Sequence, residues 1–202
     1  MVGDDGPTHN GPFDIAYLRA IPNITIMVPK DENELQHMLY TATFLRGPSS
    51  LRFSRGNAVG VGLDSEFRKL EIGKGEILNE GNDLLILGIG PILYDAMQVA
   101  EELNLNPTII NARFAKPIDE ELILKYAKKF KKIITLEEGT INGGFGSAIL
   151  ELLEKNNIKA DVKRIGIPDE FIEHAKPDIQ KKLAGIDKES IKKTIREFLN
   201  IK

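Results

Sequence analysis

Cysteine and tryptophan are both absent from the 202 residues of this chain, which also has only three histidines. The lack of cysteine excludes disulfide frameworks, thiolate zinc sites and cysteine nucleophiles, and it is compatible with a reducing cytosol. Because the three histidines are spread along the sequence and have no cysteine to join them, we expect no metal site in this chain.

An excess of charge of one sign is also missing. The chain has 27 Lys and Arg residues and 30 Asp and Glu residues, which gives a formal net charge of −3. We therefore expect no basic surface that could hold a nucleic-acid backbone. No continuous apolar run reaches the ~18 residues of a transmembrane helix, and the acidic N-terminus is unlike a secretory signal. We therefore expect a cytoplasmic protein that binds neither nucleic acid nor membrane.

The residues that are present divide into two blocks. In the first, residues 24–28 predict a strand, Asp31 caps a helix that runs to about residue 44, and residues 49–53 predict another extended segment. Residues 56–75 then contain five glycines and few large apolar side chains, a composition typical of a connecting segment.

The second block alternates strands and helices. We predict strands at residues 84–89, 108–111, 133–136 and 162–165, helices at 92–103, 119–130 and 144–156, and a last helix that begins at Asp187. The strands lack a polar alternate face, which is typical of a parallel sheet covered by helices on both sides. The predicted fold class is therefore α/β, with a mostly parallel sheet flanked by helices.

The N-terminal segment is the most informative one for function. Three glycines and two prolines between residues 3 and 12 predict a loop without regular structure, which would present His9 together with Asp4 and Asp5. An imidazole beside a carboxylate can polarise a carbonyl or move a proton near neutral pH. The alternative interpretation is a frayed chain end with a chance histidine.

The segment Asp5-Gly6-Pro7-Thr8-His9 resembles the corresponding loop of the transketolase-type thiamine diphosphate enzymes. Its continuation through residue 23 is similar to the 1-deoxy-D-xylulose-5-phosphate synthase branch of that family. Further matching stretches follow in order: PKDENEL (29–35), RFSRGN (52–57), NARFAKPID (111–119), EEG (137–139), GGFGS (143–147) and GIPDEFIEH (166–174). The resemblance covers essentially the whole chain.

This resemblance implies a domain arrangement. Residues 1–56 would be the C-terminal half of the pyrimidine-binding domain, residues 57–74 a linker, and residues 75–202 the transketolase C-terminal domain. The full enzymes are dimers that use thiamine diphosphate and Mg²⁺, and the domain that holds the diphosphate has no counterpart here. The chain would be a C-terminal fragment that binds no cofactor and is inactive alone, with the missing N-terminal part and a second copy as its partners.

The resemblance also implies a reaction and roles for individual residues. The full enzyme would condense pyruvate with D-glyceraldehyde 3-phosphate, with loss of CO2, for isoprenoid synthesis. His9 would assist proton transfer at the substrate oxygen, and Asp5 would bind substrate hydroxyls or orient His9. Arg55 would bind the substrate phosphate, which suits a planar guanidinium, whereas Arg52 is expected to form a structural salt bridge.

Three other features have competing interpretations. The glycines of residues 143–147 open a helix, where free amides could receive an anion, but we favour close packing of helix on strand. Glu137 and Glu138 are expected to be structural, since no basic or nucleophilic residue accompanies them in the sequence. His37 lies off the apolar stripe of its helix and is expected in solvent.

Two other functions stay open at this point. One is part of a split transketolase or a 2-oxo acid dehydrogenase β-type chain. The other is a non-catalytic dimerisation or regulatory module, since the resemblance implies a C-terminal domain that mainly supports the dimer.

Overall fold

The computed structural model describes residues 2–201 of the chain. Its larger sheet has five strands in the order β3-β5-β4-β7-β8. Strand β4 runs parallel to β5 and β7, β7 runs parallel to β8, and β3 pairs antiparallel with β5 at one edge. The strand bounds are β3 Glu76–Asn79, β4 Leu85–Gly88, β5 Thr108–Asn111, β7 Lys132–Thr140 and β8 Asp161–Ile167.

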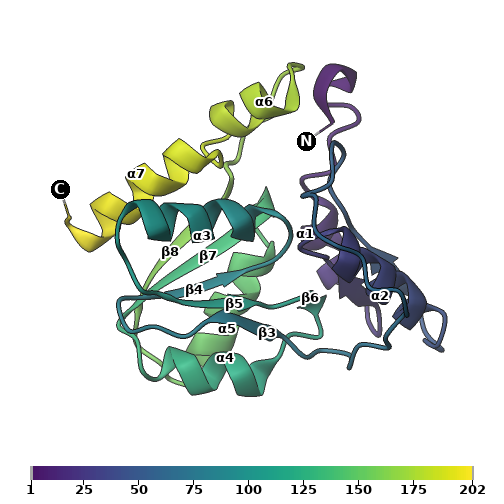
Figure 1. The fold of residues 1–202 in the computed structure, drawn as a ribbon, viewed down its shortest axis with the longest axis horizontal. Coiled ribbons are helices and arrows are strands. Elements are labelled where there is room, and N and C mark those ends of the chain that lie inside the picture. Colours follow the sequence, from purple (N-terminus) through teal and green to yellow (C-terminus); the bar gives the residue numbers. More distant parts are fainter. Residues whose placement is uncertain (1, 202) are drawn as a thin grey trace.

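Helices cover both faces of this sheet, as the strand pattern predicts (Figure 1). Within the buried stretch at β4, Leu84 and Ile86 pack toward α3 and α7, while Leu85 and Leu87 pack toward α4 and α5. Successive side chains of a strand point to opposite faces, so an uninterrupted apolar run supplies two cores. The helices are α3 Ile92–Glu102, α4 Glu120–Ala127, α5 Phe145–Lys155 and α7 Lys188–Leu199.

A second, three-stranded sheet has the order β2-β1-β6. Strands β1 (Thr25–Met27) and β2 (Ser49–Leu51) are parallel and belong to the first block, while β6 (Phe114–Lys116) comes from the second block and pairs antiparallel with β1. Phe114, on β6, packs in one apolar cluster with Met27 and Met38, so this strand joins the two blocks through a shared core.

The structure adds short elements that the sequence pattern did not predict. They are the 3-10 turn η1 (Gly3–Asp5), α1 (Asp14–Arg19), the edge strands β3 and β6, and α6 (Pro177–Leu183). The turn corrects the expectation that the N-terminal segment has no regular structure. Helix α2 (Glu32–Ala42) begins after the predicted cap Asp31, whose Oδ1 accepts the Glu34 N–H at 2.7 Å.

The segment between β2 and β3 contains no helix or strand and is held against α2 by side chains. The Glu32 carboxylate accepts the backbone N–H groups of Val59, Gly60 and Val61. The expectation that His37 lies in solvent is wrong, because it is only 3% exposed. The connecting segment covers its ring, and the backbone N–H of Arg68 donates to its Nδ1 at 3.1 Å.

Candidate functional site

The N-terminal loop is anchored on the C-terminal half of the chain. Gln180 of α6 accepts the Gly3 N–H at 2.9 Å through Oε1 and donates through Nε2 to the Gly3 carbonyl at 3.3 Å. Gly6 has φ +69°, and a Cβ added there would lie 3.3 Å from the His174 Cβ. Glycine therefore permits both the backbone turn and the close approach of the loop to residue 174.

Two of the predicted site residues meet in the structure. The Arg55 guanidinium forms an ion pair with the Asp5 carboxylate and donates to the Val2 carbonyl at 2.9 Å. The Arg55 side chain is 60% exposed and that of Asp5 44% exposed, so this pair faces solvent. An exposed ion pair contributes little to stability and exchanges partners readily, which leaves the guanidinium available to an incoming anion.

His9 is exposed in the same loop, and its Nδ1 lies 3.0 Å from the Thr8 Oγ1. Among the described residues, no hydrogen bond joins His9 to Asp5. The carboxylate that could orient the imidazole is turned toward Arg55 instead. The chemical roles of His9 and Asp5 toward a substrate therefore stay predictions.

Arg52 has the structural role that the sequence favours. Its Nε donates to the Asp14 Oδ2 at 3.2 Å and its Nη2 donates to the Glu138 carbonyl at 2.5 Å. The side chain is only 11% exposed. Of the two arginines in this stretch, Arg55 is thus the one that faces solvent.

Glu138 is buried beside this stretch and has partners that the sequence analysis did not foresee. It is 2% exposed, the Ser54 hydroxyl donates to its Oε2 at 2.6 Å, and the Lys181 Nζ lies 2.6 Å from its Oε1. The expectation that nothing basic or nucleophilic accompanies it is wrong. Burial alone would raise the pKa of Glu138, but the Lys181 ammonium and the Ser54 hydrogen bond outweigh burial and hold this pKa below its ordinary value.

The Glu137 side chain points to the face of β7 opposite to that of Glu138, and its carboxylate lies at the N-terminus of α5. Its carboxylate accepts the backbone N–H groups of Phe145 and Gly146, each at 2.8 Å. These are the amides that could have received an external anion, so this turn is filled by the protein itself. Burial raises the pKa of Glu137 despite the two N–H donors.

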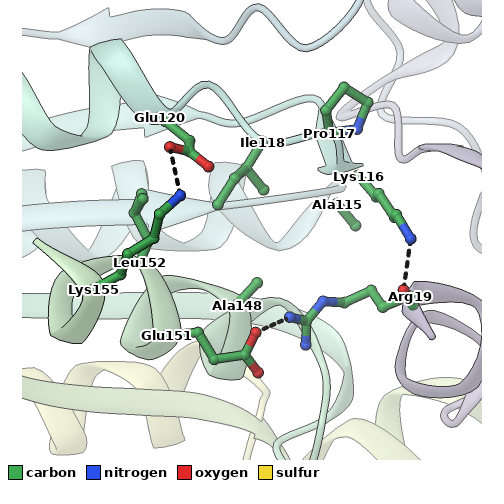
Figure 2. Close-up of a pocket in the computed structure, with 10 residues that line it drawn as sticks. All are labelled: Arg19, Ala115, Lys116, Pro117, Ile118, Glu120, Ala148, Glu151, Leu152 and Lys155. Carbon is green, nitrogen blue, oxygen red and sulfur yellow. Dashed lines mark hydrogen bonds and ion pairs between the residues drawn. The ribbon is translucent and has the colours of Figure 1, made fainter. Parts of the chain in front are cut away.

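Figure 2 shows the residues around a cavity of about 320 Å³ between α1, β6, α4 and α5. Its cations are already engaged by the protein. Arg19 lies 2.6 Å from Glu151, Lys116 donates to the Arg19 carbonyl at 2.8 Å, and Lys155 lies 3.6 Å from Glu120. The cavity lining thus has three cations and two carboxylates, and its Lys116 ammonium is bound by backbone carbonyl oxygens of Arg19 and Ile21.

Two further findings concern residues 2–201 as a whole. No group of three or more His, Asp or Glu side chains within this range is arranged to hold a metal ion. No helix in the same range is both long and apolar enough to cross a membrane.

The comparison with known families decides the relationship. The family model for the transketolase C-terminal domain matches residues 73–191, and that for the transketolase pyrimidine-binding domain matches residues 1–59. The chain belongs to the transketolase family. The resemblance read from the DGPTH loop and the stretches that follow it is thereby confirmed, together with the α/β fold class.

Individual relatives of this transketolase-family chain are more specific. The 1-deoxy-D-xylulose-5-phosphate synthase of Syntrophus aciditrophicus is 52% identical over 100% of this chain, and that of Thermosynechococcus vestitus is 50% identical over 100%. The chain spans only 32% of the length of each of these relatives. It thus corresponds to a C-terminal fragment of them.

Solved structures agree on the fold. A structure described as "Split gene transketolase, inactive beta4 tetramer" has a TM-score of 0.83 and 26% identity, covering 97% of this chain and 64% of the other. Transketolase from Leishmania mexicana has a TM-score of 0.71 at 19% identity, covering 98% of this chain and 28% of the other. The second likeness shows the fold alone.

Proposed function

We propose that this chain is the substrate-phosphate side of a 1-deoxy-D-xylulose-5-phosphate synthase. The complete enzyme would condense pyruvate with D-glyceraldehyde 3-phosphate and release CO2. The observation that carries the proposal is the solvent-facing contact of Arg55 with Asp5, within a chain that is 52% identical to such a synthase over its whole length.

The site residues divide the work in this proposal. Arg55 binds the phosphate of D-glyceraldehyde 3-phosphate, for which its guanidinium exchanges Asp5 for the phosphate oxygens. Asp5, released from that pair, accepts hydrogen bonds from the hydroxyls of the same substrate. His9 transfers a proton at the substrate oxygen, which suits an imidazole near neutral pH.

The cofactors of the synthase are thiamine diphosphate and Mg²⁺ in this proposal. Residues 2–201 contain no clustered metal ligands, and the Mg²⁺ and diphosphate groups are proposed to be held by the remainder of the enzyme. The chain alone is proposed to be inactive and to work with the remainder of the enzyme and a second copy. A cytoplasmic location belongs to the same proposal and fits a chain without cysteine.

The test compares two acceptor substrates in the full-length enzyme that contains this chain. In an Arg55→Ala variant, the KM for D-glyceraldehyde 3-phosphate should rise about 10- to 100-fold, since a charge-assisted phosphate contact is lost. The KM for unphosphorylated D-glyceraldehyde should stay unchanged. Arg46→Ala removes an exposed arginine as the matched control. An equal effect of Arg55→Ala on both acceptors would contradict the proposed role.

A split transketolase is the second candidate, favoured by the 0.83 TM-score of the split-gene structure. Supplying the missing part and measuring turnover with pyruvate against ketose phosphates separates the two. A non-catalytic module would show turnover with neither donor. Calorimetry on the fragment gives a direct check. Submicromolar binding of thiamine diphosphate to this chain alone would contradict the proposal that the cofactor is held by the remainder of the enzyme.

A further inference from the structure

Helix α6 contacts both segments of the proposed phosphate site through consecutive residues. Gln180 is 0% exposed, and its amide is fully used. It accepts the Gly3 N–H and donates to the carbonyls of Gly3 and Glu173, the latter at 2.9 Å. Since Gly3 begins the three-residue turn that ends at Asp5, Gln180 fixes the turn that carries this carboxylate.

The next residue of the helix, Lys181, reaches the other segment through Glu138. Its Nζ lies 2.6 Å from one oxygen of the Glu138 carboxylate, and the Ser54 hydroxyl donates to the other oxygen at 2.6 Å. Ser54 immediately precedes Arg55 in the sequence. Lys181 and Glu138 therefore hold the backbone from which the Arg55 side chain extends.

Neither segment has a β-ladder or a long helix to fix it. The Asp5 turn is three residues long, and the backbone after β2 contains no helix or strand until β3. Side-chain hydrogen bonds from elsewhere must therefore set the relative positions of these segments. Contacts that are buried and fully paired do this well, because breaking any one of them leaves a buried polar group without a partner.

We propose that Gln180 and Lys181 are positioning residues, which make α6 the element that sets Asp5 and Arg55 at the spacing that receives the substrate phosphate. This inference rests on the proposed function. In this proposal neither residue contacts the substrate. Each acts through a protein partner, Gln180 through Gly3 and Lys181 through Glu138 and Ser54.

The experiment uses the full-length enzyme and the two acceptors named above. Gln180→Leu and Lys181→Met should each raise the KM for D-glyceraldehyde 3-phosphate about tenfold, since small displacements of a binding group weaken it strongly. Lys181→Met should leave the KM for D-glyceraldehyde unchanged, because it acts on the Arg55 segment alone. Gln180→Leu should raise the KM for D-glyceraldehyde as well, because Asp5 is proposed to bind the hydroxyls that both acceptors carry. The KM for pyruvate should not change in either variant. Lys182→Met makes the same substitution on the exposed neighbour and should leave all three KM values unchanged.

A further pair of variants separates positioning from plain stability. Lys181→Arg keeps a cation beside Glu138 and should restore the KM. Lys181→Met combined with Arg55→Ala should raise the KM no further than Arg55→Ala alone, because both act on one phosphate contact. If Lys181→Met does not fold, Ser54→Ala, which removes the hydroxyl that joins Glu138 to the Arg55 segment, takes its place in both measurements.

The outcomes distinguish this inference from the proposed function. If Arg55→Ala shows no difference between the acceptors, the proposed function fails. If Arg55→Ala shows the difference but Lys181→Met lowers kcat alone or affects both acceptors equally, or Gln180→Leu changes no KM, only the positioning role of α6 is overturned. A rise in KM that Lys181→Met confines to the phosphorylated acceptor supports it.

Discussion

The Glu137 carboxylate gives a direct test of how the N-terminus of α5 is satisfied. The first N–H groups of a helix have no partner within the helix, and here a single buried side chain accepts two of them, from Phe145 and Gly146, each at 2.8 Å. The substitution Glu137→Gln keeps the shape of the side chain but leaves one acceptor oxygen where there were two. One backbone N–H would then face the amide NH2 group, which is itself a donor.

The expected loss follows from these contacts. A buried N–H left without an acceptor costs about 1–3 kcal/mol, and the new amide hydrogens are buried as well. Burial of the Glu137 carboxylate is itself unfavourable, as its raised pKa shows. A neutral glutamine does not carry this desolvation penalty, and this gain offsets part of the cost. We expect a net destabilisation of roughly 3 kcal/mol, which at about 2–4 °C per kcal/mol lowers Tm by about 6–12 °C.

Thermal and urea unfolding followed by circular dichroism measure this loss. Glu154→Gln is the matched control, because Glu154 lies on the same helix and is exposed, so its substitution should change stability by less than about 0.5 kcal/mol. A Glu137→Gln protein as stable as the control would refute the reasoning, since it would mean that a buried N–H left without its acceptor costs nothing net.

Three further predictions concern the core, a close backbone contact and pH. Ile195→Ala in α7 removes a side chain that is 1% exposed and should cost about 2–5 kcal/mol by urea unfolding, against little for exposed Lys193→Ala. Gly81→Ala would place a Cβ in steric clash with the Asn106 backbone carbonyl, so the urea midpoint of this variant should fall by the equivalent of about 1–3 kcal/mol. Because the pKa of Glu138 lies below its ordinary 4.5, its stabilisation is present above that pH and is lost as pH falls through the folded-state pKa. The stability gap between wild type and Glu138→Gln should therefore narrow below pH 4.5, and a gap that stays constant on acidification would contradict this ion-pair contribution.

The sequence predicted the central parallel strands and their covering helices because each of these elements carries its own signal. An uninterrupted apolar run such as residues 84–89 needs cover on both faces, whatever its neighbours are. The edge strand β3 (Glu76–Asn79) and the bridging strand β6 (Phe114–Lys116) carry no such signal. They are strands only because β5 and β1 offer them a partner, and pairing across the fold is invisible to local pattern.

Burial by a segment distant in the sequence also explains why the predicted exposure of His37 was wrong. His37 lies off the apolar stripe of α2, and in an isolated helix such a side chain would be exposed to solvent. The connecting segment folds back over this side of α2, where the Arg68 N–H donates to the imidazole Nδ1 and Asp64 lies 2.9 Å from Nε2. A glycine-rich segment without regular structure gives no sequence signal of the surface on which it lies.

For the site residues, too, the sequence predicted the residues but not their long-range contacts. Asp5, His9 and Arg55 were predicted because they lie in family motifs, but no motif predicts that Asp5 and Arg55 contact each other. The partners of Glu138 come from residue 54 and residue 181, and the only available signal was that a glutamate so close to the end of a buried strand needs a cation. That signal indicates the type of partner but not its position in the sequence.

Burial separates the polar groups of this site into two kinds with different physical roles. Glu138 and Gln180 are at most 2% exposed, and both terminal polar atoms of each side chain have a partner, so exchanging a partner would leave a buried group unsatisfied. Asp5, His9 and Arg55 are exposed, so water compensates for any partner they release. A ligand can therefore replace the Asp5–Arg55 pair without disturbing the buried contacts behind it. In our proposal the buried groups set the geometry of the site, and the exposed groups carry its chemistry.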